Sequence, residues 1–272
     1  MTTETPLPGA LQLGLARADV ELRTFFRQKD TVIFTFSLPI IMLAILGSVF
    51  AQAVDGTSIT VSQLFVGGMI AGGIASTSFI TLGASIAVDR EDGTLKRLRG
   101  TPMPKVSYFI GKVLLVLTTS VAEAALLLGV GIVLFDLELP TAAGRWFTFA
   151  WVFVVGVTAC SLVGIAVSSL ARNARSAGAL SNLGLLVLMF ASGVYFIPVA
   201  ALPGPLVGVG SLFPLKWMAQ GMRSVFLPDV LTSHEVAGAW EHGRIALVLG
   251  AWCIGGLILC LTTFRWRGRR EQ

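Results

Sequence analysis

Charged side chains are scarce in this sequence. Asp, Glu, Lys and Arg make up 13% of the 272 residues, against about 25% in an ordinary soluble domain. Hydrophobic residues make up 54%. So little charge cannot cover the surface of a water-soluble particle of this size, and we therefore expect an integral membrane protein.

Cysteine and histidine are also rare, with three and two residues respectively. His234 precedes Glu235, but the second histidine of a zinc-protease helix is missing, so we expect no metal site. A disulfide framework is not expected either, because every cysteine lies in an apolar stretch, where a thiol behaves as a small hydrophobe. These cysteines are Cys160, Cys253 and Cys260.

The sequence also lacks the motifs of several classes of membrane protein and ATPase. Gly111-Lys112 lacks the glycine of a P-loop five residues earlier, where Val106 stands, so the chain is not expected to hydrolyse nucleotide. A secondary transporter would show internal repeats and several intramembrane charges, and a membrane enzyme would show clustered His, Cys, Asp or Glu. Neither pattern occurs. The N-terminus has no basic segment before a short apolar one, so no cleaved signal peptide is expected.

Long uncharged apolar runs fill about half of the chain, and a helix needs about 20 such residues to cross a bilayer. Helices are favoured over barrel strands because these runs do not alternate with polar residues. We expect an all-α, polytopic fold with six transmembrane helices, in one transmembrane domain over residues 1–272. The runs lie near residues 31–53, 62–88, 107–135, 146–170, 178–199 and 245–264.

Lys and Arg gather on one side of these spans. Sixteen of the 20 lie in the N-terminal segment, in or beside the second and fourth connections, or in the tail at 265–272. Cytoplasmic loops hold such an excess, so both termini are predicted to be cytoplasmic. The basic residues mark one membrane face and are not interleaved with aromatic residues, which argues against binding of nucleic acid.

The segment before the first span, residues 1–30, predicts an interfacial helix that contacts membrane lipid. Its apolar residues share one helical stripe, with charged residues on other faces. The stripe consists of Leu11, Leu15, Ala18, Leu22, Phe25 and Phe26. This helix is either an anchor or a docking surface for a cytoplasmic partner.

The second cytoplasmic connection, residues 89–105, predicts a short helix. Asp92 can cap it, Leu95 and Leu98 lie one turn apart, and Gly100 with the following prolines ends it. Two interpretations remain open, a helix that docks into a groove of a partner and an ordinary basic loop.

This connection resembles the cytoplasmic signature of ABC type-2 permeases. The residues that carry the resemblance are Arg90-Glu91, Gly93-Thr94-Leu95, Leu98, Thr101-Pro102 and Gly111-Lys112. A second stretch resembles the pattern that follows the fifth span of the family, and it comprises Ser192 to Pro198, Leu202-Pro203, Phe213-Pro214-Leu215 and Arg223. Within the family, the run from Gly93 to Pro102 is most similar to the daunorubicin-resistance branch of drug-efflux permeases.

The resemblance implies a permease subunit of an ATP-driven exporter in a bacterial cell membrane, moving an amphipathic drug-like or lipid-like molecule and conferring antibiotic resistance. It implies a separate ATP-binding-cassette ATPase that holds ATP and Mg, with residues 89–105 as the coupling helix. It also implies a second permease chain, identical or related. Export of a lipid-linked polysaccharide is the alternative, and a secondary transporter is a more distant one.

Polar residues within the spans are candidates for a substrate pathway. Glu123 is the only carboxylate deep in a span, and it must face protein or water because lipid exposure costs too much. Hydroxyls at 118–120, or Asn182 in the fifth span, could hydrogen-bond it. A buried structural carboxyl and a pathway residue are both compatible with this position. The glycine-rich run from Gly67 to Gly73 favours close helix packing.

The connection between the fifth and sixth spans is punctuated by proline, notably Pro198, Pro203 and Pro214. The apolar pieces between these prolines are too short to cross a bilayer, which predicts re-entrant half-helices. The later part, around His234 and His242, is expected to form a solvated external helix.

Overall fold

The computed structural model of the chain describes residues 9–54, 57–101, 103–170 and 174–263. Within these ranges the regular elements are helices, and an isolated antiparallel bridge joins Ala53 to Thr60. The all-α expectation is confirmed for these residues. The helices are α1 Ala10–Arg27, α2 Lys29–Val49, α3 Val61–Ala75, the π-helical turn η1 Ser76–Thr81, α4 Leu82–Glu91, α5 Thr94–Arg99, α6 Lys105–Phe135, α7 Ala143–Leu170, α8 Ala174–Ala191, η2 Val199–Ala201, α9 Gly204–Leu212, α10 Pro214–Phe226, η3 Asp229–His234 and α11 His242–Thr263.

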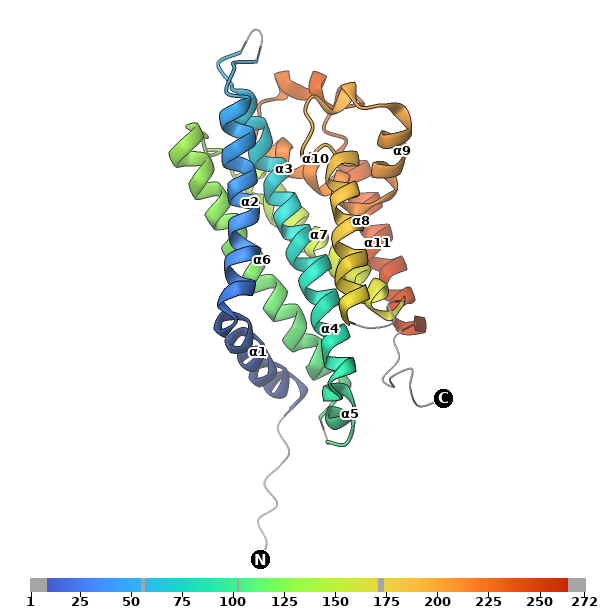
Figure 1. Cartoon of the computed structure of the whole chain (residues 1–272). Coiled ribbons are helices and arrows are strands. Elements are labelled where there is room, and N and C mark those ends of the chain that lie inside the picture. The colour runs from blue at the N-terminus through green and yellow to red at the C-terminus, as the bar shows by residue number, and fades with distance from the viewer. Residues whose placement is uncertain (1–8, 55–56, 102, 171–173, 264–272) are drawn as a thin grey trace, which may run out of the picture.

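The long helices lie alongside one another and alternate in direction (Figure 1). Helix α1 lies at one end of the bundle together with the short helix α5, which follows the descending α3 and α4. Helices α9 and α10 lie toward the opposite end. We call these the α5 end and the α10 end. Helix α11 runs back toward the α5 end, so the described chain begins and finishes on that side.

Five helical segments are long and apolar enough to cross a membrane. They match five of the six expected runs, because a continuous apolar segment in lipid can satisfy its backbone hydrogen bonds internally only as a helix. The chain is therefore a multi-pass membrane protein. The five segments are Lys29–Val49, Val61–Glu91, Lys105–Phe135, Ala143–Ser168 and His242–Cys260.

The run expected at 178–199 stops early, because α8 ends at Ala191. Gly193 has a φ of 67°, in the left-handed region, and its N–H bonds to the carbonyl of Phe190, which ends the helix. A Cβ at Gly193 would lie 2.5 Å from Val199 Cγ2, so glycine is required there. The apolar part of α8 is shorter than the five spans, and the six-span count stays a prediction.

The second span is not a uniform α-helix. Between α3 and α4 the chain forms the π-helical turn η1. Gly164 of α7 lies against this turn, since a Cβ at Gly164 would lie 2.7 Å from the carbonyl oxygen of Phe79. The turn is thus held closely by a neighbouring helix in the middle of the membrane segment.

The glycine-rich run of α3 serves packing, as predicted. A Cβ at Gly67 would lie 2.9 Å from Arg223 Cα, and one at Gly72 would lie 2.9 Å from Met189 Sδ. The missing side chains let α10 and α8 approach α3 closely.

Short helices begin at or directly after Pro198, Pro203 and Pro214. Pro198 and Pro203 are the N-cap residues of η2 and α9, and Pro214 is the first residue of α10, where its fixed φ suits a helix. All of α10 is buried, and it packs against α3, α7 and α11. Short helices are therefore present, while their re-entry into a membrane stays a prediction. The expected external helix near His234 is only the 3-10 helix η3, which is followed by the buried Glu235.

Candidate functional site

Helix α5 forms the tip of the α5 end and carries the segment that the sequence singled out (Figure 1). Gly93 precedes it with a φ of 78°, and the Thr94 N–H donates to Asp92 Oδ1 at 2.8 Å. Partial burial raises the pKa of Asp92, but the Thr94 hydrogen bonds and the nearby Arg97 outweigh it and leave the pKa below its usual range. Asp92 therefore supports the start of α5 as an ionised acceptor, one residue before the N-cap.

The leucines of α5 face their own chain. Leu95 is 1% exposed and belongs to the main core, and Leu98 is half-buried against that core. Lys96, Arg97 and Thr101 are exposed. Leu95 thus anchors α5, and the surface that a partner can reach is polar and basic, not the apolar one that the sequence suggested. Pro102, Arg172 and the tail at 265–272 lie outside the described residues.

A cluster of four charges, the inner charge cluster, joins α4 to α1 and α6. Lys112 Nζ lies 2.7 Å from Asp89 Oδ2 and 3.0 Å from Glu21 Oε1. Arg17 lies 2.5 Å from Glu21 and 3.8 Å from Asp89, and the Tyr108 hydroxyl donates to Asp89 at 2.8 Å. Two positive and two negative groups balance where little water reaches, so the cluster holds three helices together.

Close backbone approaches support the inner charge cluster. A Cβ at Gly14 would lie 2.6 Å from Ile110 Cγ2, and one at Gly111 would lie 2.6 Å from Arg17 Cγ, so α1 and α6 cross closely. Arg90 Nη1 donates to the Ser168 carbonyl at 2.9 Å, which ties α4 to α7. Helix α4, which leads directly into α5, is therefore held by three neighbours.

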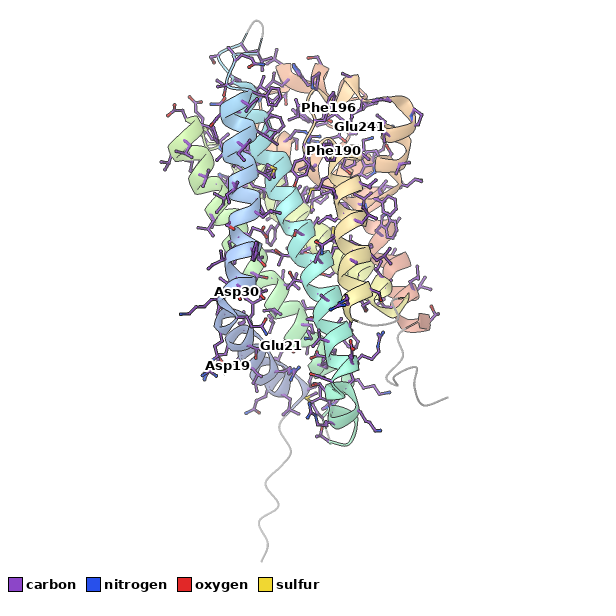
Figure 2. All side chains as sticks on the ribbon, in the orientation of Figure 1. Asp19, Glu21, Asp30, Phe190, Phe196 and Glu241 are labelled. Atoms are coloured by element: carbon purple, nitrogen blue, oxygen red, sulfur yellow. The ribbon has the colours of Figure 1, made fainter. Side chains whose placement is uncertain are left out.

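The inner charge cluster was not predicted from the sequence. Lys112 stands inside a predicted span, and a cation buried there requires an acid close by. The position of Lys112 in the sequence could therefore have predicted a pairing with acids such as Glu21 and Asp89. Glu21, labelled in Figure 2, comes from the helix that precedes the first span.

Glu123 is buried between α6 and the second span, with 1% exposure. Its carboxylate accepts a hydrogen bond from the Thr77 hydroxyl in the π turn, where the hydroxyls at 118–120 or Asn182 were expected. A Cβ at Gly73 would lie 2.6 Å from Glu123 Oε1, and this oxygen has no hydrogen-bond partner among the described residues. Contact between Glu123 and a transported molecule would require these helices to separate, and it stays a prediction.

Asn182 does not hydrogen-bond Glu123, as had been considered from the sequence. It is exposed on α8, and its Nδ2 donates to the Gly178 carbonyl at 2.9 Å. Its exposed neighbours on α8 are Leu180, Leu183 and Leu186. An amide on such an apolar surface needs cover from protein or water.

The α10 end contains a buried ion pair. Arg223 Nε lies 2.6 Å from Glu235 Oε1, its Nη2 donates to Glu235 Oε2 at 3.2 Å, and its Nη1 donates to the Gly193 carbonyl at 3.1 Å. Both side chains are nearly inaccessible, at 2% and 3% exposure. Arg223 was singled out in the sequence only through the family resemblance, and its pairing with Glu235 was not predicted.

The histidines do not gather with other metal ligands. His242 Nε2 lies 3.0 Å from Ser224 Oγ, and His234 lies in η3. Among the described residues, no group of three or more His, Cys, Asp and Glu is placed to hold a metal ion.

Comparison with known families gives one finding. The family model described as ABC-2 type transporter matches residues 15–227. No curated protein matches the sequence. The matched segment begins within α1 and ends just after α10, so it includes the inner charge cluster and Arg223 but not Glu235.

Proposed function

The chain belongs to the ABC-2 type transporter family, and we propose that it exports an amphipathic drug-like or lipid-like molecule with energy from a separate ATPase. A membrane domain of this family is a transport subunit. In the proposal, an ATP-binding-cassette chain holds ATP and Mg and moves α5. The protein lies in a bacterial cell membrane with the α5 end in the cytoplasm, and it serves drug efflux and antibiotic resistance, as in the daunorubicin-resistance branch.

The inner charge cluster is the observation that supports this proposal. Helix α5 is anchored by Leu95 and follows α4, whose last turn carries Asp89 and Arg90. Asp89 contacts Arg17 of α1 and Lys112 of α6, and Arg90 donates a hydrogen bond to α7. Packed elements shift as bodies and do not deform continuously, so a displacement of α5 passes to several spans at once.

The ATPase contact is assigned to the exposed basic residues of α5. Lys96 and Arg97 face outward from a helix whose apolar side is buried. Such a surface complements a groove that is rimmed with carboxylates.

The test is the double variant Lys96→Glu and Arg97→Glu. We expect it to reach the membrane normally, to lose co-purification with its partner ATPase, and to lose ATP-driven uptake of a fluorescent amphiphile into inverted vesicles. Arg23→Glu, which changes an exposed arginine of α1, is the matched control and should keep both. A double variant that still bound the ATPase and transported normally would remove α5 from the coupling role.

A second permease chain is part of the proposal, and Asn182 supports it. This exposed amide lies on an otherwise apolar face of α8, where a protein partner or a polar pathway between two chains would cover it. With the native cysteines replaced, Asn182→Cys should form a disulfide-linked dimer in membranes. Leu257→Cys on the exposed face of α11 serves as the control and should remain monomeric.

A further inference from the structure

The α10 end contains a loop that covers one face of α10. This cap loop, residues 227–241, joins α10 to α11. Beneath it, α10 carries four buried polar residues at spacings of three and four, which places them on one helix face. This polar stripe consists of Lys216, Gln220, Arg223 and Ser224.

Polar contacts attach the cap loop to the stripe. Glu235 accepts the two hydrogen bonds from Arg223 already described, at 2.6 and 3.2 Å. Gln220 Nε2 donates to the Ala239 carbonyl at 2.9 Å. Ser224 Oγ contacts His242, the first residue of α11, at 3.0 Å. A ligand that carries a charge and hydrogen-bonding groups could replace these contacts between the cap loop and the polar stripe.

Three apolar residues of the cap loop pack with Val54 and with Leu64 of α3 in a small cluster distinct from the main core of the bundle. Trp240 Nε1 also donates to Asp229 Oδ1 at 2.9 Å, which braces the loop internally. The cap loop is thus held to the bundle by this small cluster and by the polar contacts above, so its opening would break these contacts and leave the main core packed. The cluster consists of Val54, Leu64, Leu227, Leu231 and Trp240.

Arg223 would not follow the cap loop. Its backbone lies against Gly67 of α3, and its Nη1 is bound to the Gly193 carbonyl. Once Glu235 leaves, a guanidinium remains in the bundle without its carboxylate, which is unfavourable unless another anion arrives. Lys216 adds a second positive charge to the stripe. It contacts Ser211 Oγ and the Trp217 ring, and the acids that act on it electrostatically are Glu241 and Glu235 of the cap loop.

We propose that Glu235 occupies the place of an acidic headgroup, and that the exported molecule carries a carboxylate or phosphate that binds Arg223 when the cap loop opens. This inference rests on the proposed export function and specifies its substrate class. An amphiphile fits better than a small anion, because the stripe lies on a helix whose other faces are packed against apolar core residues. Guanidinium and carboxylate or phosphate form paired hydrogen bonds, so a headgroup can reproduce the contact that Glu235 makes.

The test measures binding to the purified permease alone in detergent. The probes are a fluorescent long-chain carboxylic acid and a trimethylammonium amphiphile with the same chain and fluorophore. Glu235→Gln keeps the shape but removes the competing charge, so the acid should bind severalfold more tightly while the ammonium probe is unchanged. Glu138→Gln changes an exposed carboxylate at the same end and should alter neither affinity. An equal gain for both probes would mean mere loosening and would overturn the proposal.

Two paired variants keep the ion pair balanced. Arg223→Glu combined with Glu235→Arg retains an opposite-charge pair and should reverse the preference in favour of the ammonium probe. The neutral pair Arg223→Gln with Glu235→Gln should lose tight binding of the acid. An unchanged preference in either paired variant would contradict the assignment, and if neither purifies as a single species, Glu235→Gln decides alone. Competition by inorganic phosphate at the probe's concentration would assign the site to a soluble anion instead of an amphiphile.

The binding assay contains no ATPase, so it is independent of the test of coupling through α5. Loss of ATPase association in the Lys96 and Arg97 variant leaves the prediction for Glu235 unaffected. Conversely, ATP-driven transport that shows no preference for acidic amphiphiles would reject the acidic headgroup and leave the export function standing.

Discussion

The two ends of the bundle both bury charges, but they pair them differently. At the α5 end, Lys112 meets Glu21 across 91 positions of sequence, and Asp89 joins them from a third helix. At the α10 end, Arg223 and Glu235 are 12 positions apart, separated by the end of α10 and the short helix η3. The first arrangement ties distant helices into one body, whereas the second closes a local loop over one helix. It follows that a displacement at the α5 end spreads through the bundle, while a displacement of the cap loop at the α10 end stays local.

The orientation of these two ends gives the largest expected effect, because labelling is all or none. With the native cysteines replaced, a cysteine at Lys96 should be shielded from an impermeant thiol reagent in intact cells, while one at His234 should react. The excess of Lys and Arg at the α5 end is the physical reason. Labelling at position 96 from outside would reverse the assignment of the two ends.

Breaking the inner charge cluster should have the next largest effect. Lys112→Met leaves the two buried acids Asp89 and Glu21 with Arg17 as their one remaining cation in the cluster, which should cost about 3–5 kcal/mol in the free energy of unfolding. The midpoint of thermal unfolding in detergent measures this loss. Adding Asp89→Asn should restore part of it, while Arg23→Ala, which breaks an exposed pair, should change little. Equal midpoints for Lys112→Met and Arg23→Ala would mean that the cluster does not hold the helices together.

A smaller effect is expected from Gly111→Ala, which pushes α1 away from α6. The new methyl would lie 2.6 Å from Arg17 Cγ, and such overpacking costs about 1–3 kcal/mol. Gly255→Ala on α11 meets no atom within 4 Å and should be neutral or slightly stabilising. Thermal unfolding and ATPase stimulation should both fall in the first variant only. A fall in stability without loss of stimulation would separate packing from coupling.

The smallest effect concerns Asp92. Its pKa is lower in the folded protein than in the unfolded chain, so its contribution to α5 is present at neutral pH and is lost as the pH falls through the folded-state pKa. Asp92→Ala should therefore speed amide exchange at Thr94 near neutral pH, and this difference from the wild type should shrink in acid. Asp92→Asn, which still accepts the hydrogen bond, is the control. A difference that persists unchanged in acid would assign the effect to the backbone alone.

The long apolar helices could be predicted from the sequence because they depend only on the local pattern of residues. The runs of α2, α6, α7 and α11 are continuous in apolar residues, so length and composition were enough to identify them. The end of α8 was also within reach, because Gly193 signals a helix terminus, but its neighbours are apolar and the run was extended past it.

The sequence did not predict which face of an element meets the rest of the chain. The spacing of Leu95 and Leu98 shows that they share a face, but only the fold turns that face inward. The hydrogen bond from Thr77 to Glu123 joins residues 46 positions apart, and nothing local marks Thr77 as the donor. Long-range pairings of single polar residues leave no periodic trace in a sequence.

The π-helical turn sets how the two halves of the second span are rotated about their axis. A π turn adds one residue to an α-helix, and one residue corresponds to about 100° of rotation. Removing a residue from Ser76–Thr81 would therefore swing Asp89 and Arg90 away from Lys112 and Ser168 by roughly a quarter turn, while the glycines of α3 kept their contacts. The direction in which α5 points at the surface of the protein therefore depends on the π-helical turn inside the membrane segment.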